Sequence, residues 1–529
     1  MSIVVTSLTH VHPDGGCLFS DISFTISKGQ KAALLGNNGV GKSTLLKLLA
    51  KPDSKRDDFI LSEHPYYVPQ HLGQYDDYTI AQALGISDKL FALHAILSGD
   101  ASEENFNLLD NDDWDIEEKA KAAMNYWNIA HLDLMQPMKT LSGGEKTKVF
   151  LSGISIHTPS IVILDEPSNH LDMEGRRVLY DFVRKSKATI LVVSHDRALL
   201  NLLNTTIELF PYGVELYGGN YDFYKAMRAN KLQALKSQLE EKEKQLKQTQ
   251  QRAKEMAQQR QKQEIRAKKG TPSKGLARIV AGGLGAKAEE TSSKLKDTQT
   301  EKMNDISESL SQIRQQIQEQ TILKIDLSKS PLHRGKILIG VKDMNHTYSQ
   351  SPLWEVPLNF QICSGDRIRI CGNNGSGKTT LLKILTRNIL PTEGEAFFAD
   401  FRFLYIDQEY TMIDHTLSVF EQVQRFNDRH MEEHELKILL HHHQLTQTFW
   451  DRQCGDLSGG EKMKLLLCCV IVSNSTPDMI ILDEPANNLD IYSLEVLAEA
   501  IKSFAGTVLV ISHDQYFIEN IGTNKEITL

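Results

Sequence analysis

The strongest constraint on the fold of this chain is that four short motifs occur twice, in the same order. A glycine-rich stretch at 36–43 returns at 372–379, and both copies precede Leu-Ser-Gly-Gly-Glu, Ile-Leu-Asp-Glu-Pro and Ser-His-Asp. The last three motifs recur at offsets of 316, 318 and 318 residues, whereas the first recurs at 336. Repetition at a nearly fixed spacing indicates a duplicated module. The 529 residues therefore divide into two modules of roughly 200 residues each and an insert between them.

The insert between the modules has a composition of its own. No Phe, Trp or Tyr occurs from Lys225 to Thr347, so this stretch cannot build an ordinary core. Apolar residues nevertheless fall at coiled-coil spacing on both sides of a glycine-rich break, as Leu232, Leu235, Leu239 and Leu246 and then as Ile306, Leu310, Ile313 and Ile317. This spacing predicts a hairpin of two long antiparallel helices with its tip at Gly270–Lys287. A flexible tether is the alternative, although a tether does not need two apolar seams.

Positive charge is concentrated in the same insert. Residues 225–287 hold 17 Lys and Arg against 5 Asp and Glu, a net charge of +12 in a chain whose total is −9. A basic block on an acidic protein is typical of a contact with a polyanion such as RNA. A solvated linker is the alternative that charge alone leaves open.

Each glycine-rich stretch lies between an apolar strand and a helix, which is the context that a phosphate-binding P-loop requires. Its glycines let backbone N–H groups turn toward phosphates, while the lysine reaches the outer phosphates and the hydroxyl that follows it binds Mg²⁺. The residues predicted to bind a nucleotide in this way are Gly36, Asn37, Asn38, Gly39, Val40, Gly41, Lys42, Ser43 and Thr44, and then Gly372, Asn373, Asn374, Gly375, Ser376, Gly377, Lys378, Thr379 and Thr380.

A later buried strand ends in Asp-Glu in both modules. The aspartates stand where a carboxylate holds Mg²⁺, and the glutamates are placed to polarise the attacking water. A glutamine and a histidine also follow strands at matched positions and are expected to reach the metal, the water or the γ-phosphate. The predicted catalytic residues are Glu166, Glu484, His195, His513, Gln70 and Gln408. The predicted Mg²⁺ ligands are Ser43, Gln70, Asp165, Thr379, Gln408 and Asp483.

These motifs, in this order, resemble those of a tandem ATP-binding-cassette protein, and the resemblance covers nearly all of the chain outside 225–330. It implies an α/β fold of two P-loop cassettes, joined here by the predicted α-helical hairpin (coiled-coil) linker, with ATP and Mg²⁺ as cofactors. It also implies that the Leu-Ser-Gly-Gly-Glu signature of each cassette completes the ATP site of the other. Ser458, Gly459 and Gly460 would then complete the site of Lys42, and Ser142, Gly143 and Gly144 that of Lys378. Adenine would stack on His12 in the first site and on Tyr348 in the second.

Two fused cassettes without a membrane domain, and with a basic hairpin between them, resemble the ABC-F branch of this family. The resemblance implies an ATPase that binds the ribosomal exit (E) site and contacts rRNA and the P-site tRNA through residues 225–330. It implies a monomer in which residues 1–224 form cassette 1, 225–335 the linker and 336–529 cassette 2. A housekeeping role on misplaced tRNA and ribosome protection against antibiotics both remain open. The alternative is an ATPase subunit that works with separate membrane subunits of a transporter.

Other features argue against competing classes of protein. No run of about 18 apolar residues is present, so no direct membrane insertion is expected, and the first residues lack the pattern of a secretory signal. Six cysteines without CxxC spacing argue against zinc and iron–sulfur modules and fit a reducing cytosol, so the expected location is cytoplasmic. An acidic insertion at 98–118 is expected to shape the first cassette and to avoid rRNA. The histidines at 441–443 lack acidic or cysteine partners and are expected to form a polar helix surface.

Overall fold

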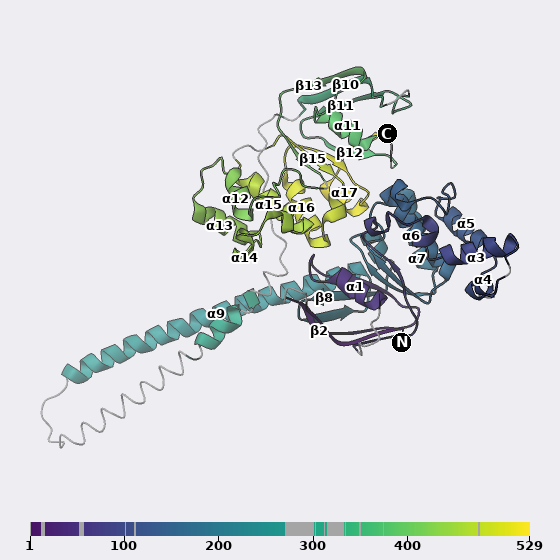
Figure 1. Cartoon of the computed structure of the whole chain (residues 1–529). Coiled ribbons are helices and arrows are strands. Elements are labelled where there is room, and N and C mark those ends of the chain that lie inside the picture. Colours follow the sequence, from purple (N-terminus) through teal and green to yellow (C-terminus); the bar gives the residue numbers. More distant parts are fainter. Residues whose placement is uncertain are drawn as a thin grey trace. The chain divides into compact units, whose positions relative to one another are not determined.

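The protein divides into two compact units in the computed structural model. The described residues are 2–11, 16–51, 58–100, 102–109, 113–269, 301, 303–311, 313–314, 333, 335–348, 351–373, 375–407, 409–473 and 477–529. Unit 1 comprises Met1–Asp222 and Leu323–Leu529, and unit 2 comprises Phe223–Ile322. Unit 1 contains both modules, and unit 2 is the insert between them (Figure 1).

Cassette 1 is built on two sheets. The first has the strand order β2-β1-β4 and is antiparallel, and the second has the order β5-β6-β7-β3-β8-β9 and is parallel except for its last pair. The strands are β1 (Ile3–Val11), β2 (Cys17–Ile26), β3 (Lys31–Leu35), β4 (Phe59–Leu61), β5 (Tyr66–Val68), β6 (Ile161–Asp165), β7 (Thr189–Val193), β8 (Thr205–Phe210) and β9 (Gly213–Tyr217).

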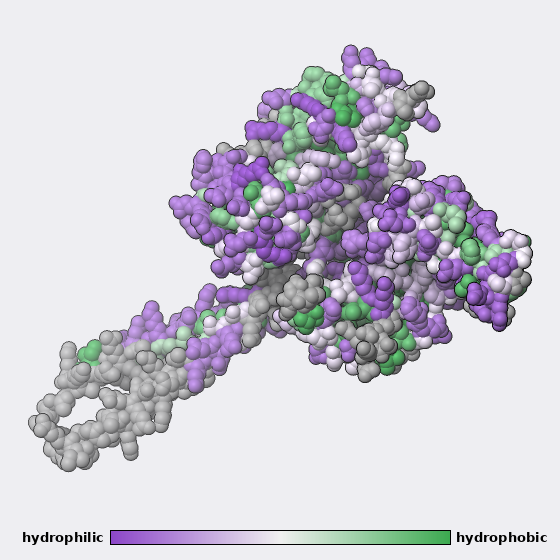
Figure 2. Space-filling view, in the orientation of Figure 1, coloured by the Kyte–Doolittle hydropathy of each residue, from purple (hydrophilic) through white to green (hydrophobic). Residues whose placement is uncertain are grey.

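Cassette 2 repeats this plan with a smaller main sheet. Its antiparallel sheet has the order β11-β10-β13, and its parallel sheet has the order β14-β15-β16-β12-β17. The strands are β10 (Ile337–Asn345), β11 (Leu358–Cys363), β12 (Arg367–Cys371), β13 (Glu393–Phe398), β14 (Phe403–Ile406), β15 (Met479–Asp483), β16 (Thr507–Ile511) and β17 (Lys525–Thr528). On the face shown in Figure 2, hydrophobic residues gather over this antiparallel sheet, where Phe397 is exposed.

Continuous apolar runs explain why the central strands are parallel and covered on both faces. Every residue of β6, β7 and β16 is buried, which is typical of strands between two helical layers. The carboxyl ends of β3 and β12 lead into the glycine-rich stretches, as the sequence predicts. Ligands of open parallel sheets bind at these strand ends, because the loops that follow the strands converge there.

Each cassette also contains several helices, not all of which pack on its parallel sheet. In cassette 1 they are α1 (Lys42–Ala50), α2 (Ile80–Ala83), α3 (Ser87–Leu97), α4 (Glu103–Leu108), α5 (Ile116–Tyr126), α6 (Gly143–His157), α7 (Met173–Lys185) and α8 (Arg197–Leu200). In cassette 2 they are α11 (Lys378–Leu385), α12 (Val419–Arg425), α13 (Glu433–His442), α14 (Gln447–Trp450), α15 (Gly459–Val472), α16 (Ile491–Ser503) and α17 (Gln515–Ile521). Short 3₁₀ turns occur at Gly73–Tyr75, Met138–Thr140, Cys454–Asp456 and Pro485–Asn488.

The acidic insertion of cassette 1 packs within its own helical region. Lys89 of α3 donates to Asp113 at 2.6 Å, and His94 of the same helix lies 3.0 Å from Glu117 of α5. These contacts tie part of the insertion to α3, which accounts for acidic residues there without any contact with RNA.

Unit 2 contains the long helix α9, which spans Tyr221–Lys269 and begins at the end of unit 1. Its leucines Leu232, Leu235, Leu239 and Leu246 are half-buried between exposed polar residues, and residues 303–311 are also helical. Arg314 Nη2 donates to Glu243 Oε1 at 2.7 Å, and the buried Leu310 lines a cavity with Leu246. The two helical segments therefore lie side by side. The predicted tip at Gly270–Lys287 and the seam residue Ile317 lie outside the described residues.

Candidate functional site

The two glycine-rich loops have the same backbone form. Gly41 and Gly377 stand immediately before α1 and α11 with φ values of 100° and 90°. A Cβ atom would lie 2.7 Å from a leucine methyl group in either place, Leu18 at Gly41 and Leu353 at Gly377. Only glycine tolerates both this conformation and this contact, so the helix N-terminus stays open to a ligand.

A lysine folds back over each loop. Lys42 Nζ donates to the carbonyl oxygens of Gly36 at 2.8 Å and Asn37 at 3.0 Å. In the second loop, Lys378 Nζ donates to Gly372 at 2.8 Å and to the next carbonyl at 2.9 Å. Burial lowers the pKa of both lysines, and the nearby acidic residues act against this shift. A partly buried cation at the start of a helix is a fitting partner for a polyphosphate.

The predicted metal ligands lie beside these loops. Ser43 Oγ donates to Asp165 Oδ1 at 3.2 Å, and Tyr67 donates to the other oxygen at 3.1 Å. In cassette 2, Tyr405 donates to Asp483 Oδ2 at 3.0 Å. Burial raises the pKa of both aspartates. A hydroxyl and a carboxylate meeting beside a phosphate cradle form an oxygen donor set that fits Mg²⁺.

The two predicted catalytic glutamates share a strained backbone. Glu166 and Glu484 follow β6 and β15 with φ values of 52° and 48°, a region that non-glycine residues rarely occupy. Their N–H groups donate to Val193 and Ile511 at 2.8 and 2.9 Å, which holds the strained turns against the neighbouring strands. Strain of this kind persists where the surrounding structure fixes it, and it collects at functional sites.

Each glutamate faces the histidine predicted to accompany it. His195 Nε2 lies 2.9 Å from Glu166 Oε1, and the backbone N–H of His195 donates to the other carboxylate oxygen at 3.2 Å. The corresponding distance between His513 Nε2 and Glu484 Oε1 is 3.3 Å. The structure therefore brings both predicted pairs together, although the two residues of each pair are 29 positions apart in sequence.

The two pairs differ in charge state. Burial alone would raise the pKa of Glu166, but His195 and Lys42 outweigh burial and hold this pKa below its usual value. For Glu484 burial prevails and raises the pKa to about 7. Burial, with Arg176 as the next contributor, lowers the pKa of His513 to about 4. The first pair thus favours an ionised carboxylate, whereas the second stands close to protonation at neutral pH.

Each lysine and glutamate lines a cavity that the opposite cassette completes. The first cavity, of about 620 Å³, is lined by Lys42, Glu166 and His195 of cassette 1 and by Ser458 and Gly459 of cassette 2. The second cavity, of about 690 Å³, is lined by Lys378, Glu484 and His513 of cassette 2 and by the stretch Ser142–Gly144 of cassette 1. The linings therefore have the head-to-tail pairing that the resemblance to a tandem cassette protein implies.

The signature serines begin the helices that face these cavities. Ser142 accepts from the N–H of Glu145 at 3.3 Å, and the Glu145 side chain accepts from the Ser142 N–H at 2.8 Å. Ser458 and Glu461 form the same capping box at α15. Reciprocal capping fixes the first turn, so the N–H groups of the following glycines are presented to the cavity in a set direction.

Most of the remaining predicted residues line a cavity, whereas Val40, Ser376 and Gly460 are described and line neither one. Asn38, Gly39, Gly41, Ser43, Thr44 and Gln70 line the first cavity, and Gly375, Gly377, Thr379, Thr380, Asp483 and Tyr348 line the second. Tyr348 is 66% exposed and its hydroxyl lies 3.1 Å from Thr380 Oγ1, so its ring is open to stacking. His12, Asn374 and Gln408 lie outside the described residues.

The structure adds site residues that motif reasoning missed. Asp490 of cassette 2 accepts from the Asn38 N–H at 3.1 Å, across the interface and in the first glycine-rich loop. Lys462 also lines the first cavity, and Arg176 lines the second. The repeated Leu-Asp dipeptide at 171–172 and 489–490 was the available signal for Asp490, but nothing in the sequence singles out Arg176.

The histidine run at 441–443 differs from expectation at one residue. His443 is buried, and burial lowers its pKa to about 4, so it is not part of a polar helix surface. Among the described residues, no group of three or more His, Cys, Asp or Glu side chains could hold a metal ion.

The chain is similar to known proteins over nearly its whole length. The family model described as "ABC transporter" matches residues 19–169 and 356–487. ABC transporter F family member 5 of Arabidopsis thaliana is 26% identical over 538 residues, covering 96% of this chain and 72% of that protein. The ATP-binding protein Uup of Escherichia coli is 28% identical over 535 residues, covering 96% and 77%. The uncharacterized ABC transporter ATP-binding protein YfmM of Bacillus subtilis is 27% identical and covers 99% and 98%.

Solved structures support the fold. The archaeal ribosome recycling factor aABCE1, in complex with the ribosomal stalk protein aP1, has a TM-score of 0.57 at 18% identity, covering 99% of this chain and 87% of that chain. A model of ribosome-bound archaeal Pelota and ABCE1 has a TM-score of 0.56 at 19% identity. Within the residues that the structure describes, no helix has the length and apolar character needed to cross a membrane.

Proposed function

The chain belongs to the ATP-binding-cassette family as a tandem ATPase of the ABC-F type, and on this premise we propose that it is an ATP-driven factor of the ribosome. In this proposal it binds the E site and acts through unit 2 on the P-site tRNA and the rRNA around the peptidyl-transferase region. Two observations together carry the proposal. Both cassettes line each of the two cavities, and a basic helical insert separates the cassettes in the sequence.

The chemistry of each cavity follows from its own residues. Lys42 and Lys378 would leave their loop carbonyls for the β- and γ-phosphates of ATP, and the signature glycines would offer N–H groups to the γ-phosphate from the opposite side. Glu166 and Glu484 would accept a proton from the attacking water, and the paired histidines hold these carboxylates in place. Mg²⁺ held by Ser43 and Asp165, or by Thr379 and Asp483, would neutralise charge on the phosphates.

Closure of the cassettes follows from the same geometry. Because both cassettes line each cavity, ATP favours the form in which they are together, and hydrolysis removes that preference. The interface already contains direct contacts, including Arg197 Nη2 to Glu495 Oε1 at 2.9 Å and Tyr492 OH to Glu208 Oε1 at 3.1 Å. In this account ATP sets the lifetime of the complex with the ribosome.

The proposed RNA contact rests on the charge of unit 2. The +12 charge of residues 225–287 is carried largely by α9, and Lys236, Lys244 and Lys247 are exposed on this helix. On the face shown in Figure 2, the described part of α9 is mainly hydrophilic, as expected for a helix that meets phosphates. The rest of the chain is acidic and would bind RNA poorly.

The consequence of binding can take two forms within this proposal. The chain would either clear stalled or misplaced tRNA or displace an antibiotic from the peptidyl-transferase region, and both use the binding energy of the ATP-closed form. Either role would place the protein in the cytoplasm, where ribosomes are. Growth of a strain that expresses the chain, across a panel of ribosome-targeting antibiotics, distinguishes the two roles.

Sucrose-gradient cosedimentation tests the ribosome proposal. The variant Glu166→Gln/Glu484→Gln should travel with ribosomes in ATP and remain at the top of the gradient in ADP, because ATP is bound but not hydrolysed. If this variant stays off ribosomes in ATP but binds membranes that contain a transport channel, the alternative role as a transporter ATPase is supported instead.

A charge-matched pair of variants tests the RNA contact. Replacing Lys236, Lys244, Lys247 and Lys254 of α9 by Gln should weaken ribosome binding. It should also make the slope of log K against the logarithm of the salt concentration shallower, by about one for each phosphate contact that is lost. The control replaces four exposed lysines of unit 1, Lys28, Lys187, Lys342 and Lys502, and should change binding little. An equal loss of ribosome binding in both variants would mean that binding depends on the total charge of the chain and not on the lysines of α9.

A further inference from the structure

The short helix α8 begins next to the first cavity. Its first residue, Arg197, stands two positions after His195, which lines that cavity. The residue between them, Asp196, accepts from the N–H groups of Ala198 and Leu199 at 3.0 and 3.2 Å. A carboxylate that caps the first turn fixes where a helix begins. The place of α8 is therefore tied to the place of His195.

The capping carboxylate is itself held by the neighbouring helix. Arg176 Nη1 of α7 donates to Asp196 Oδ2 at 3.3 Å, and Tyr180 of the same helix donates to the same oxygen. The Asp196 N–H donates to Ser194 Oγ at 3.1 Å. These bonds come from two different elements, so α8 starts from a firmly positioned residue.

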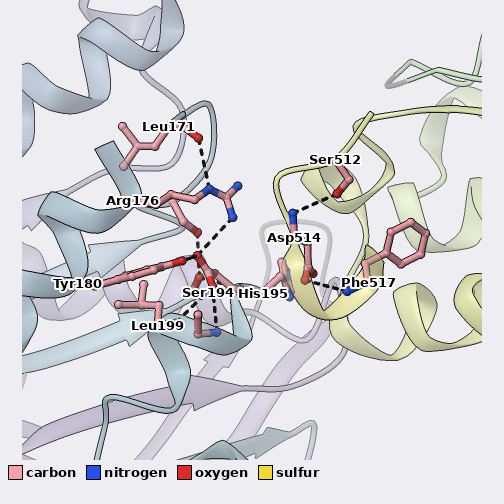
Figure 3. A network of polar contacts seen from close by, with 12 residues as sticks. Leu171, Arg176, Tyr180, Ser194, His195, Leu199, Ser512, Asp514 and Phe517 are labelled. Carbon is pink, nitrogen blue, oxygen red and sulfur yellow. Dashed lines mark hydrogen bonds and ion pairs between the residues drawn. The ribbon is translucent and has the colours of Figure 1, made fainter. Parts of the chain in front are cut away.

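A helix of cassette 2 has a cap of the same kind. At the start of α17, Asp514 accepts from the N–H of Phe517 at 3.0 Å, and its own N–H donates to Ser512 Oγ at 3.1 Å. Figure 3 shows these three residues opposite the labelled network of cassette 1. The Ser-His-Asp motif of each cassette thus sets the start of a helix at the interface.

The residues at the two ends of α8 contact cassette 2. Arg197 Nη2 donates to Glu495 Oε1 of α16 at 2.9 Å, and Asn201 Nδ2 donates to the Tyr516 hydroxyl of α17 at 3.3 Å. Among the described residues, Glu495 is the hydrogen-bond partner of the Arg197 guanidinium, whose Nε is buried without one. Separation of the cassettes would remove this partner, so the place of Arg197 depends on closure.

The same two residues of α8 contact the start of α9. The guanidinium carbon of Arg197 lies 5.7 Å from the centroid of the Tyr221 ring, within the range of cation–π attraction. Asn201 Oδ1 accepts from the Asp222 N–H at 3.0 Å. This N–H is among the first four of α9, which have no acceptor within the helix, so Asn201 caps α9 from outside. Tyr221 and Asp222 belong to unit 1, and α9 continues from them into unit 2.

The matched positions of cassette 2 do not form such a bridge. The offset of 318 places Gln515 and Glu519 where cassette 1 has Arg197 and Asn201. Gln515 donates to Glu519 at 3.1 Å, and neither side chain reaches cassette 1 among the described contacts. The bridge therefore belongs to the cassette that continues into the basic insert.

We propose that α8 is a coupling element, through which ATP-driven closure of the cassettes stabilises the first turn of α9. While ATP holds the cassettes together, α16 and α17 fix the side chains of Arg197 and Asn201, and these side chains hold the start of α9. When the cassettes separate, both side chains lose their partners in cassette 2, and the first turn of α9 opens more readily. The inference rests on the proposed role of ATP in closing the cassettes, and it adds a route from the nucleotide to the helix that carries the basic residues.

Hydrogen exchange at the start of α9, measured by mass spectrometry on the purified full-length chain, tests the coupling. In a non-hydrolysable ATP analogue, the amides of 221–228 should exchange about tenfold more slowly than in ADP, a ratio typical of coupling between two sites. Glu495→Gln/Tyr516→Phe changes cassette 2 alone and removes the charge and the hydroxyl that α8 meets. In this variant the protection at 221–228 should fall below about twofold. The loop at 36–43 should stay protected, since neither residue lines a cavity.

Glu499→Gln/Tyr212→Phe is the matched control, because it removes the same two groups from exposed positions. It should keep the full difference in exchange between the analogue and ADP. Asn201→Ala acts from the cassette 1 side and should also remove the protection at 221–228. Asn201→Ala decides the case if the cassette 2 variant no longer binds the analogue, which exchange at 36–43 reports.

Three outcomes would overturn the proposal. They are equal exchange at 221–228 in the analogue and in ADP for the unmodified chain, full protection in Glu495→Gln/Tyr516→Phe or in Asn201→Ala, and an equal loss in the control. Ribosomes do not enter this experiment, so its failure leaves the proposed ribosomal role intact. A chain that shows the coupling but stays off ribosomes in ATP would contradict the proposed function and leave the role of α8 in place.

Discussion

The two cavities shared by the cassettes have the same backbone form and different electrostatics. Both have a glycine-rich loop before a helix, a glutamate whose backbone is in the left-handed region and a histidine that faces this glutamate. Both also receive a capped signature helix from the opposite cassette. Yet the pKa of Glu166 is held below its usual value, whereas that of Glu484 is raised to about 7. Duplicated motifs therefore set the geometry of a site, while burial and the charged neighbours that the folded chain supplies set its charge state.

The largest expected effect comes from removing both bases. Glu166→Gln/Glu484→Gln should lower ATP turnover by about a hundredfold or more, because a glutamine cannot accept the proton of the attacking water. Phosphate release under saturating ATP measures this loss. The two single variants sharpen the comparison of the sites, because their residual rates show how much of the ATP turnover each cavity contributes. Turnover close to that of the unmodified chain in the double variant would contradict both assignments.

The interface between the cassettes is also asymmetric, because a buried ion pair on one side has no counterpart at the matched positions among the described contacts. Arg197 and Glu495 are 5% and 12% exposed, and the matched positions hold Gln515 and Arg177, which form no such pair among the described contacts. Arg197→Ala should destabilise the ATP-bound chain by about 3 kcal/mol, because it breaks a buried ion pair between the cassettes. Thermal melts in ATP measure the effect. Gln515→Ala is the control and should change the melting temperature little.

The acid limb of activity should separate the two cavities. In a Glu166→Gln chain, where Glu484 is the working base, the rate should fall as the pH drops through about 7, since a raised pKa means protonation already near neutrality. In a Glu484→Gln chain the rate should persist to lower pH, because the pKa of Glu166 is depressed. Initial rates between pH 5 and 9, in about half-unit steps, show the two limbs. If the acid limbs of the two single variants coincide, the two cavities do not differ in the pKa of their glutamates.

The smallest expected effect concerns adenine. Tyr348→Ala should weaken ATP binding at the second cavity by about three- to tenfold, the loss of one aromatic stacking contact. Binding of a fluorescent ATP analogue measures the change, and Tyr348→Phe is the control, since it keeps the ring and loses only the hydroxyl near Thr380. An unchanged affinity in Tyr348→Ala would mean that adenine lies elsewhere.

Much of the fold and of the site could be predicted because the motifs are local. The change from an apolar strand to a glycine-rich loop and then to a helix determines where Lys42 and Lys378 stand, and the Asp-Glu ends of β6 and β15 place both glutamates. The head-to-tail pairing of cavities and signature helices came from the resemblance to a tandem cassette protein, and the cavity linings have the same pairing.

The remaining features depend on contacts between distant parts of the chain. Arg176 lines the same cavity as Glu484, which stands more than 300 residues later, and Asp490 accepts from the backbone N–H of Asn38 across a separation of 452 residues. The repeated Leu-Asp dipeptide marks Asp490 in the sequence, but it does not indicate which backbone this residue binds, and no local pattern singles out Arg176. Both pairs have the same Glu and His residues, so their different pKa values follow only from burial and from neighbours that the folded chain supplies.

The central claim is that each ATP site is completed by the opposite cassette. Photo-crosslinking of azido-adenine ATP to the Glu166→Gln/Glu484→Gln chain, followed by peptide mapping, measures occlusion at each site separately. Ser458→Arg should abolish labelling of cassette 1 around Lys42 and leave cassette 2 labelled, and Ser142→Arg should do the reverse. If Ser458→Arg instead removes the label from cassette 2, where this serine itself resides, the shared construction of the sites is contradicted.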